Sequence, residues 1–175
     1  DQLLKMSNTN DTPNYVKSCY EGSAFKVEKT LMKKYFDICE DVKKALEFKE
    51  EVDFYIVSDA SVNAGAYLRP SDDQPHTIII HSGLIQLMND NELKFVIGHE
   101  IGHLIERHSE LGKLINFVYP GAKPVSLTYK ISLWNQLAEL ESDRYGFLAC
   151  RDLSVGVSAL FKITTGLDLD KFDMN

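Results

Sequence analysis

Two histidines and a glutamate in the segment FVIGHEIGHLIERHS have the spacing of a metal site. His99 and His103 are four residues apart, so on a helix, at about 100° per residue, they return to nearly the same face. Two neutral imidazoles on a rigid helix suit zinc, and Glu100 can reach a metal-bound water without binding the metal. The H-E-x-x-H pattern therefore predicts two zinc ligands and a base, although it arises by chance in about one such chain in a hundred.

A zinc site that keeps an open coordination position needs a third protein ligand, which is often a carboxylate. The segment LAELESDRYG offers three candidates on one expected helix, Glu139, Glu141 and Asp143. Glu139 and Asp143 share a helix face, whereas Glu141 points about 200° away from Glu139. We therefore expect Glu139 to bind zinc and Asp143 to hold the N–H of a histidine ligand from behind. An ordinary solvated acidic face is the alternative.

A helix must carry the two histidines, and the surrounding sequence predicts one. Apolar residues recur with the helical period from Leu93 to Ile105. Asn89 is followed three residues later by Glu92, an arrangement that satisfies free amide donors at a helix start. We expect a capped, largely buried helix that also holds a metal; a purely structural helix without metal is the alternative.

Small residues predict how this helix packs. Gly98 and Gly102 lie one turn apart beside the histidines, and each costs about 1 kcal/mol relative to alanine in a helix interior. Such a cost is reasonable where another backbone must approach closely. Ser142 and Gly146 lie near the face that carries Glu139, so we expect the two helices to pack tightly there.

The remaining sequence predicts an α+β fold that is mainly helical and has a small three-stranded sheet. Segments rich in β-branched and aromatic residues predict strands at 52–59, 62–70 and 76–83. Amphipathic periodicity predicts an N-terminal helix over 23–51 and further helices over 127–150 and 155–165, and Pro120, Gly121 and Pro124 mark a loop within 111–126.

The totals fit one folded domain and argue against two classes of partner. The 175 residues are 44% apolar and 26% charged, which is ordinary for a globular protein. A formal charge of -7 and the lack of a clustered basic patch argue against nucleic acid or an anionic membrane surface as the main partner. No segment approaches the roughly 18 consecutive apolar residues of a membrane-spanning helix.

Cysteine usage bears on the compartment. Cys19, Cys39 and Cys150 are widely spaced and form no C-x-x-C pair, which predicts free thiols in a reducing compartment. We therefore expect a cytoplasmic location. Because the sequence starts at Asp1, a periplasmic or secreted protein with a removed signal or anchor is the alternative.

The motif from His99 to His103, with Glu139 and Asp143 in the later segment ELESDRYG, resembles the gluzincin metallopeptidases related to HtpX and the CAAX prenyl proteases. The segments NAGAY and TIIIHSGLIQLMNDNELKFVIGHEIGH resemble the family's Asn-Ala-x-Ala segment and its strand, turn and helix start. His108 matches a recurrent family position, and the similarity covers about residues 52 to 165. Because the sequence shows no membrane helices like those of these proteases, it resembles the soluble, minimal-domain members of the family, called minigluzincins.

The resemblance implies a zincin-like metallopeptidase domain over 23–175, with a catalytic core over 52–165. The polar residues at the start of the sequence predict a leader over 1–22. It implies one zinc ion per chain and hydrolysis of peptide bonds in protein substrates. The family's metal ligands correspond to His99, His103 and Glu139, and its general base corresponds to Glu100. A latent or inactive zinc-binding domain that acts as a protein-binding module is the alternative function.

Other residues are expected to bind substrate or to support the predicted metal ligands. The resemblance places Asn63, Ala64 and Ala66 on the rim of the cleft, where they would pair with an extended substrate. His108 is expected behind the metal ligands, in a structural or supporting role. No histidine follows it, so the group that stabilises the tetrahedral intermediate stays open, with Arg144 and Tyr119 as candidates. Two further histidines are expected outside the site, His81 at a strand end and His76 in a loop.

Overall fold

The structure, a computed structural model, describes residues 24–168, whose sheet consists of four short strands. They are β1 (Ala24–Lys26), β2 (Val52–Val57), β3 (Ala64–Tyr67) and β4 (His76–His81), in the order β1-β2-β4-β3. The central strands β2 and β4 are parallel, and β1 and β3 pair antiparallel with them at the two edges. Within the described residues β3 therefore has one side without a strand partner.

The prediction of three strands was wrong, because β1 lies inside the segment 23–51 that the periodicity predicts as one helix. Only α3 (Lys33–Ala45) is helical there. Residues 24–26 pair with 55–57, and Lys26 Nζ lies 2.7 Å from Asp53 Oδ1. The neighbouring strand offers main-chain hydrogen bonds that compete with local helix preference. The predicted leader over 1–22 lies outside the described residues.

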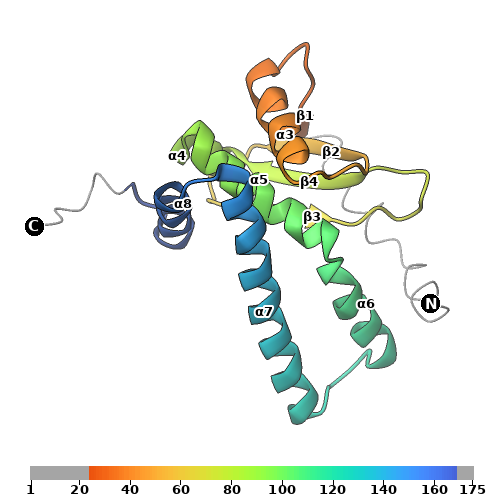
Figure 1. Cartoon of the computed structure of the whole chain (residues 1–175). Coiled ribbons are helices and arrows are strands. Elements are labelled where there is room, and N and C mark those ends of the chain that lie inside the picture. Colours follow the sequence, from red (N-terminus) through yellow and green to blue (C-terminus); the bar gives the residue numbers. More distant parts are fainter. Residues whose placement is uncertain (1–23, 169–175) are drawn as a thin grey trace, which may run out of the picture.

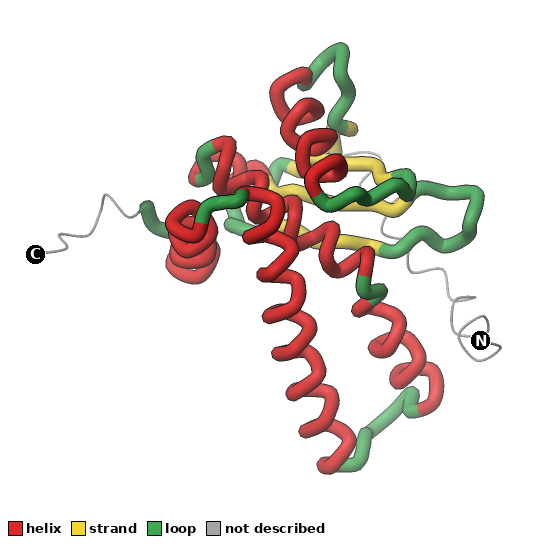
Figure 2. The backbone as a smooth tube through the Cα atoms, in the orientation of Figure 1, coloured by secondary structure: helices red, strands yellow, loops and turns green. Residues whose placement is uncertain are grey.

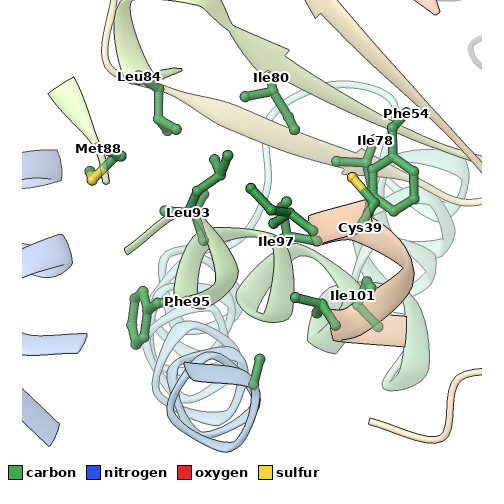
Figure 3. Close-up of a cluster of buried hydrophobic side chains, with 14 of the residues drawn as sticks. Cys39, Phe54, Ile78, Ile80, Leu84, Met88, Leu93, Phe95, Ile97 and Ile101 are labelled. Carbon is green, nitrogen blue, oxygen red and sulfur yellow. The ribbon is translucent and has the colours of Figure 1, made fainter. Parts of the chain in front are cut away.

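The core lies between the sheet and two helices, α3 and α5 (Asp90–Ile105), as Figure 3 shows. Ile78 and Ile80 of β4 point from the sheet toward Leu93 and Ile97 of α5 (Figure 3). Cys39 and Val42 bring α3 into the same cluster, and all of these side chains are buried. The helix with the two histidines is therefore fixed along one side by a large apolar contact.

The N-terminal end of α5 is fixed by polar contacts. Asn89 caps the helix and Glu92 completes the predicted capping box. Lys162 of α8 (Leu153–Thr165) is buried and lies 3.0 Å from Glu92 Oε2, and its ammonium also donates to the carbonyl of Leu87 at the end of α4 (Ser82–Leu87). Three helices thus meet at one satisfied buried ion pair.

The second long helix, α7 (Val125–Cys150), packs on α5 through small residues, as the sequence predicts. A Cβ added at Gly98 would lie 2.5 Å from Ala149 Cβ and 3.2 Å from Gly146 Cα. A Cβ added at Gly146 would lie 2.8 Å from the ring of Phe95. The two helix backbones are therefore in contact, and the glycines are required by this close approach.

A projecting helical pair, which we call the arm, consists of α6 (His108–Val118) and the N-terminal half of α7, residues 125–137 (Figure 1). Figure 2 shows both helices leaving the body and joined at their far ends by the loop 119–124. The loop that Pro120, Gly121 and Pro124 predict within 111–126 is present at 119–124, and α6, which the sequence did not predict, precedes it. No helix within the described residues is long and apolar enough to cross a membrane.

Candidate metal centre

Three side chains converge between α5 and α7. His99 and His103 come from the last two turns of α5, and Glu139 comes from the second half of α7. His99 Nε2 lies 3.0 Å from His103 Nε2 and 3.4 Å from Glu139 Oε2, and His103 Nε2 lies 3.7 Å from Glu139 Oε1. One ligand atom from each residue can be chosen so that all lie within 4.8 Å of one another.

These separations suit a tetrahedral zinc ion. Ligand atoms about 2.0 to 2.1 Å from zinc in tetrahedral geometry are about 3.3 Å from one another, which is close to the three distances above. Two imidazole nitrogens and one carboxylate also form a donor set that catalytic zinc sites use. The residues present therefore fit the metal, and three ligands leave one coordination position open.

The electrostatics of the three residues favour a positive charge between them. Burial alone would lower the pKa of His99, but hydrogen bonds with Asp143 and Glu139 raise it to about 9. Burial and the neighbouring His99 lower the pKa of His103 to about 4. The hydrogen bond with His99 lowers the pKa of Glu139. The carboxylates of Asp143 and Glu139 thus favour a positive charge on His99, beside the place a metal cation would take.

Both histidines are held from behind. His99 Nδ1 lies 2.9 Å from Asp143 Oδ1, the contact that the helical spacing predicts for this carboxylate. His103 Nδ1 lies 3.0 Å from Nδ1 of His108. His108 is the first residue of α6, and Arg107 before it has a left-handed backbone with φ of 53°, which turns the chain between α5 and α6. Both residues expected in supporting positions therefore lie against the predicted ligands.

Glu100 is buried beside this cluster, with 8% of its surface exposed. Burial raises the pKa of its carboxyl to about 7, while the nearby His99 lowers it and Glu139 raises it further. A hydrogen bond from the backbone N–H of Ala66 also lowers this pKa. A carboxyl with a pKa near neutrality can both take up and release a proton under physiological conditions.

A cleft of about 620 Å³ opens over these residues. Its rim includes Asn63, Ala64 and Ala66 on and next to the edge strand β3, opposite the histidines of α5. Because main-chain groups alternate along a strand, the N–H groups of Ala64 and Ala66 both point away from β4. The cleft is also lined by apolar side chains that the sequence did not single out, which come from α7 and α8: Trp134, Ala138, Leu160 and Ile163.

Other candidates from the sequence lie elsewhere. The described lining of the cleft includes neither Arg144 nor Tyr119. His81 ends β4 as expected, and its Nδ1 lies 2.6 Å from Ser61 Oγ. The placement of His76 in a loop was wrong: it begins β4 and is fully buried, where Nδ1 accepts the N–H of Arg69 and Nε2 lies 3.0 Å from Glu50 Oε2. Arg69 and Glu50 thus occupy both ring nitrogens of His76, which solvent would do at an exposed loop position.

Comparisons with known proteins agree with this geometry. Peptidase family M48 matches residues 33–122, just over half of the chain, a range that contains α5. The chain belongs to this family of metallopeptidases. It therefore has the relationship to HtpX that the motif suggested.

Three relatives illustrate how far the similarity extends. The plastoglobule-localized metallopeptidase 48 of Arabidopsis thaliana is 31% identical over 126 residues, which cover 67% of this chain and 36% of that protein. A protease HtpX homolog of Bacteroides fragilis is 38% identical over 66 residues, 38% of this chain and 20% of its own length. The metalloprotease YcaL of Escherichia coli is 53% identical over 30 residues, 17% of this chain and 12% of its own length. The chain thus spans about a third or less of these relatives.

Proposed function

We propose that this domain is a zinc-dependent endopeptidase that hydrolyses peptide bonds in protein substrates. The observation that carries the proposal is the convergence of His99, His103 and Glu139 at ligand distances, with Glu100 buried next to them and facing the same cleft. The names of the three relatives, a metallopeptidase, a protease and a metalloprotease, support the same class of reaction.

Each residue has a chemical task in this proposal. When bound, zinc supplies a Lewis acid that polarises the peptide carbonyl and lowers the pKa of a coordinated water. Glu100 would accept a proton from the attacking water and then donate it to the leaving amine. Asp143 and His108 hold the second ring nitrogens of His99 and His103, so that the first nitrogens stay free for the metal.

Substrate is expected to lie along the free side of β3. The N–H groups of Ala64 and Ala66 point to this side, where they donate to Asn63 Oδ1 and to the carboxyl of Glu100. A bound substrate would replace these two contacts. An extended peptide can pair with such an edge through main-chain hydrogen bonds, which are independent of side-chain identity. Asn63, Ala64 and Ala66 would then position the scissile bond above Glu100.

The test compares wild type with Glu100→Gln for zinc content and for cleavage of casein, an unfolded protein. We expect both proteins to bind one zinc ion per chain, because the substituted residue is not a ligand. Cleavage should fall by about a hundredfold or more, because the amide cannot take up the proton. Glu40→Gln on the exposed surface of α3 is the matched control and should cleave like wild type.

Two results would contradict the proposal. Equal activity of Glu100→Gln and wild type would exclude Glu100 as the base. Bound zinc with no cleavage of any unfolded protein by the wild type would favour the alternative function, a latent or inactive zinc-binding domain that binds other proteins.

A further inference from the structure

The two histidines of the metal centre differ in what lies behind them. The second nitrogen of His99 meets a carboxylate directly, at 2.9 Å from Asp143 Oδ1. The second nitrogen of His103 meets another imidazole, at 3.0 Å from His108 Nδ1. Behind His108 lies a further carboxylate, because His108 Nε2 is 3.4 Å from Glu141 Oε2. His103 thus reaches a carboxylate only through a third side chain.

The donor and acceptor roles along this chain of contacts follow from the metal site. If His103 Nε2 binds the metal, the proton of this imidazole must be on Nδ1, which then donates to His108 Nδ1. An accepting Nδ1 places the proton of neutral His108 on Nε2, which faces Glu141. Each hydrogen bond therefore has one possible direction, from His103 to His108 to Glu141.

We propose that Glu141 is a positioning residue of the metal centre, which acts through His108 to orient His103 and to keep its Nε2 free for the metal. The inference rests on the proposed zinc site. It assigns a role to the one carboxylate of ELESDRYG that helical spacing places away from the metal. Glu141 does not need to face the metal for this role, because it contacts the far side of His108.

The surroundings of His108 fit such a role. The residue is buried, and the ring of Trp134 meets it edge to face with the centroids 5.5 Å apart, so its ring plane is fixed by packing. Ser142 Oγ lies 3.4 Å from Nδ1, on the side of His103. Within residues 24–168, Glu141 is the hydrogen-bond partner of Nε2. Its carboxylate therefore favours the tautomer of His108 that carries the proton on Nε2.

The first experiment measures zinc affinity by competition with a chelator, so that cleavage activity is not needed. Outer partners of metal ligands contribute about tenfold or more to affinity, and we expect Glu141→Ala, one residue farther out, to weaken binding about fivefold. Glu141→Gln should keep most of the affinity, because its amide oxygen still accepts from His108 Nε2. Glu110→Gln is the matched control: it removes the same charge near the site from a carboxylate that pairs with Arg107.

The second experiment tests whether Glu141 acts through His108. Asparagine at position 108 can accept from His103 Nδ1 but has no group that reaches Glu141, so His108→Asn keeps the first hydrogen bond and removes the second. In this background Glu141→Ala should change zinc affinity by less than about twofold, because coupled residues are not additive. The side chain of Glu141 is half exposed, so its substitution leaves the fold intact even if His108→Asn is poorly stable.

Different results would contradict the role of Glu141 and the proposed function. Unchanged zinc affinity in Glu141→Ala, or the same loss with and without His108, would overturn the role of Glu141 and leave the proposed peptidase function untouched. If the wild type binds no zinc, the proposed function fails. Nitrogen NMR of the metal-free protein then still tests the contact, since His108 should carry its proton on Nε2 in wild type and lose this preference in Glu141→Ala.

Discussion

The two halves of helix α7 have opposite relations to the rest of the molecule. In the C-terminal half, small side chains recur every three or four residues and are buried against α5: Ala138, Ser142, Gly146 and Ala149. In the N-terminal half, large apolar side chains are exposed, including Val125 at 87% and Tyr129 at 71%. Glu139 and Asp143 belong to the packed half, so the candidate metal centre lies where two backbones are in contact.

This difference has a physical consequence for the site. Ligand atoms must stay within about 0.5 Å of their positions to bind a metal well, and rigid, closely packed elements provide this better than projecting ones. The same contrast separates α5 from α6, because His103 lies on the buried helix while His108 begins the arm. The candidate metal centre thus lies at the boundary between the packed body and the arm.

The largest effect that we expect is that of metal on the packed half. Zinc bound by His99, His103 and Glu139 links α5 to α7, and ligand at about a thousand times its dissociation constant adds about 4 kcal/mol to the free energy of unfolding. Thermal unfolding with zinc and with a chelator measures this difference. Hydrogen exchange should show the added protection in α5 and residues 138–150.

The matched control for metal is Glu139→Ala, which removes one proposed ligand from an exposed position and should lose most of the zinc-dependent stabilisation. A melting temperature of the wild type that does not respond to zinc or chelator would contradict the prediction. If zinc added equal hydrogen-exchange protection to the arm and to the packed half of α7, the two regions would not differ in rigidity as we describe.

The next effect concerns the contact between the backbones. Gly98→Val would place its Cβ 2.5 Å from Ala149 Cβ and 3.0 Å from the carbonyl oxygen of Tyr145, both shorter than van der Waals contact. Overpacking of this kind costs about 3 kcal/mol. The urea concentration at the midpoint of unfolding should fall, while the slope of the free energy of unfolding against urea concentration stays constant. A midpoint equal to that of wild type would show that the helices separate easily and that the contact is not rigid.

Much of the packed half could be predicted from the sequence, because its signals are local. The apolar period and the capping pair of Asn89 and Glu92 predict α5, and Gly98 with Gly146 predicts a close helix contact. Helical spacing alone also predicts that Glu139 and Asp143 share a face, and the structure brings both to the histidines.

Other features depend on contacts between distant residues and could not be read from local patterns. β1 exists because a neighbouring strand pairs with it, and His76 is buried because Glu50 and Arg69 satisfy both of its nitrogens. Glu141 was excluded as a ligand by its angle on α7, and that angle is what brings it to His108. The sequence signal that could have found Glu141 is His108 itself, because a histidine that supports a metal ligand needs an acceptor for its other ring nitrogen.

A smaller effect of opposite sign is expected in the arm. An added Cβ at Gly112 in α6 has no neighbour within 4 Å, so Gly112→Ala should gain the helix preference of alanine without a clash, about 1 kcal/mol or somewhat less. Urea unfolding at equilibrium measures the gain, and Gly98→Val is the opposite case. If Gly112→Ala destabilised the protein, α6 would have to pack against atoms that lie outside residues 24–168.

The smallest effect is expected on the outer face of α7. Leu133 is 47% exposed, and an exposed side chain outside special contacts changes stability by no more than about 0.5 kcal/mol, so Leu133→Ala should unfold at nearly the wild-type urea concentration. The matched change at a buried position, Leu104→Ala in α5, should cost about 3 kcal/mol because it leaves a cavity. Since both substitutions remove the same atoms, the difference between them measures burial alone. A cost at Leu133 close to that at Leu104 would mean that the projecting half of α7 is covered in solution, and the contrast between its two halves would then fail.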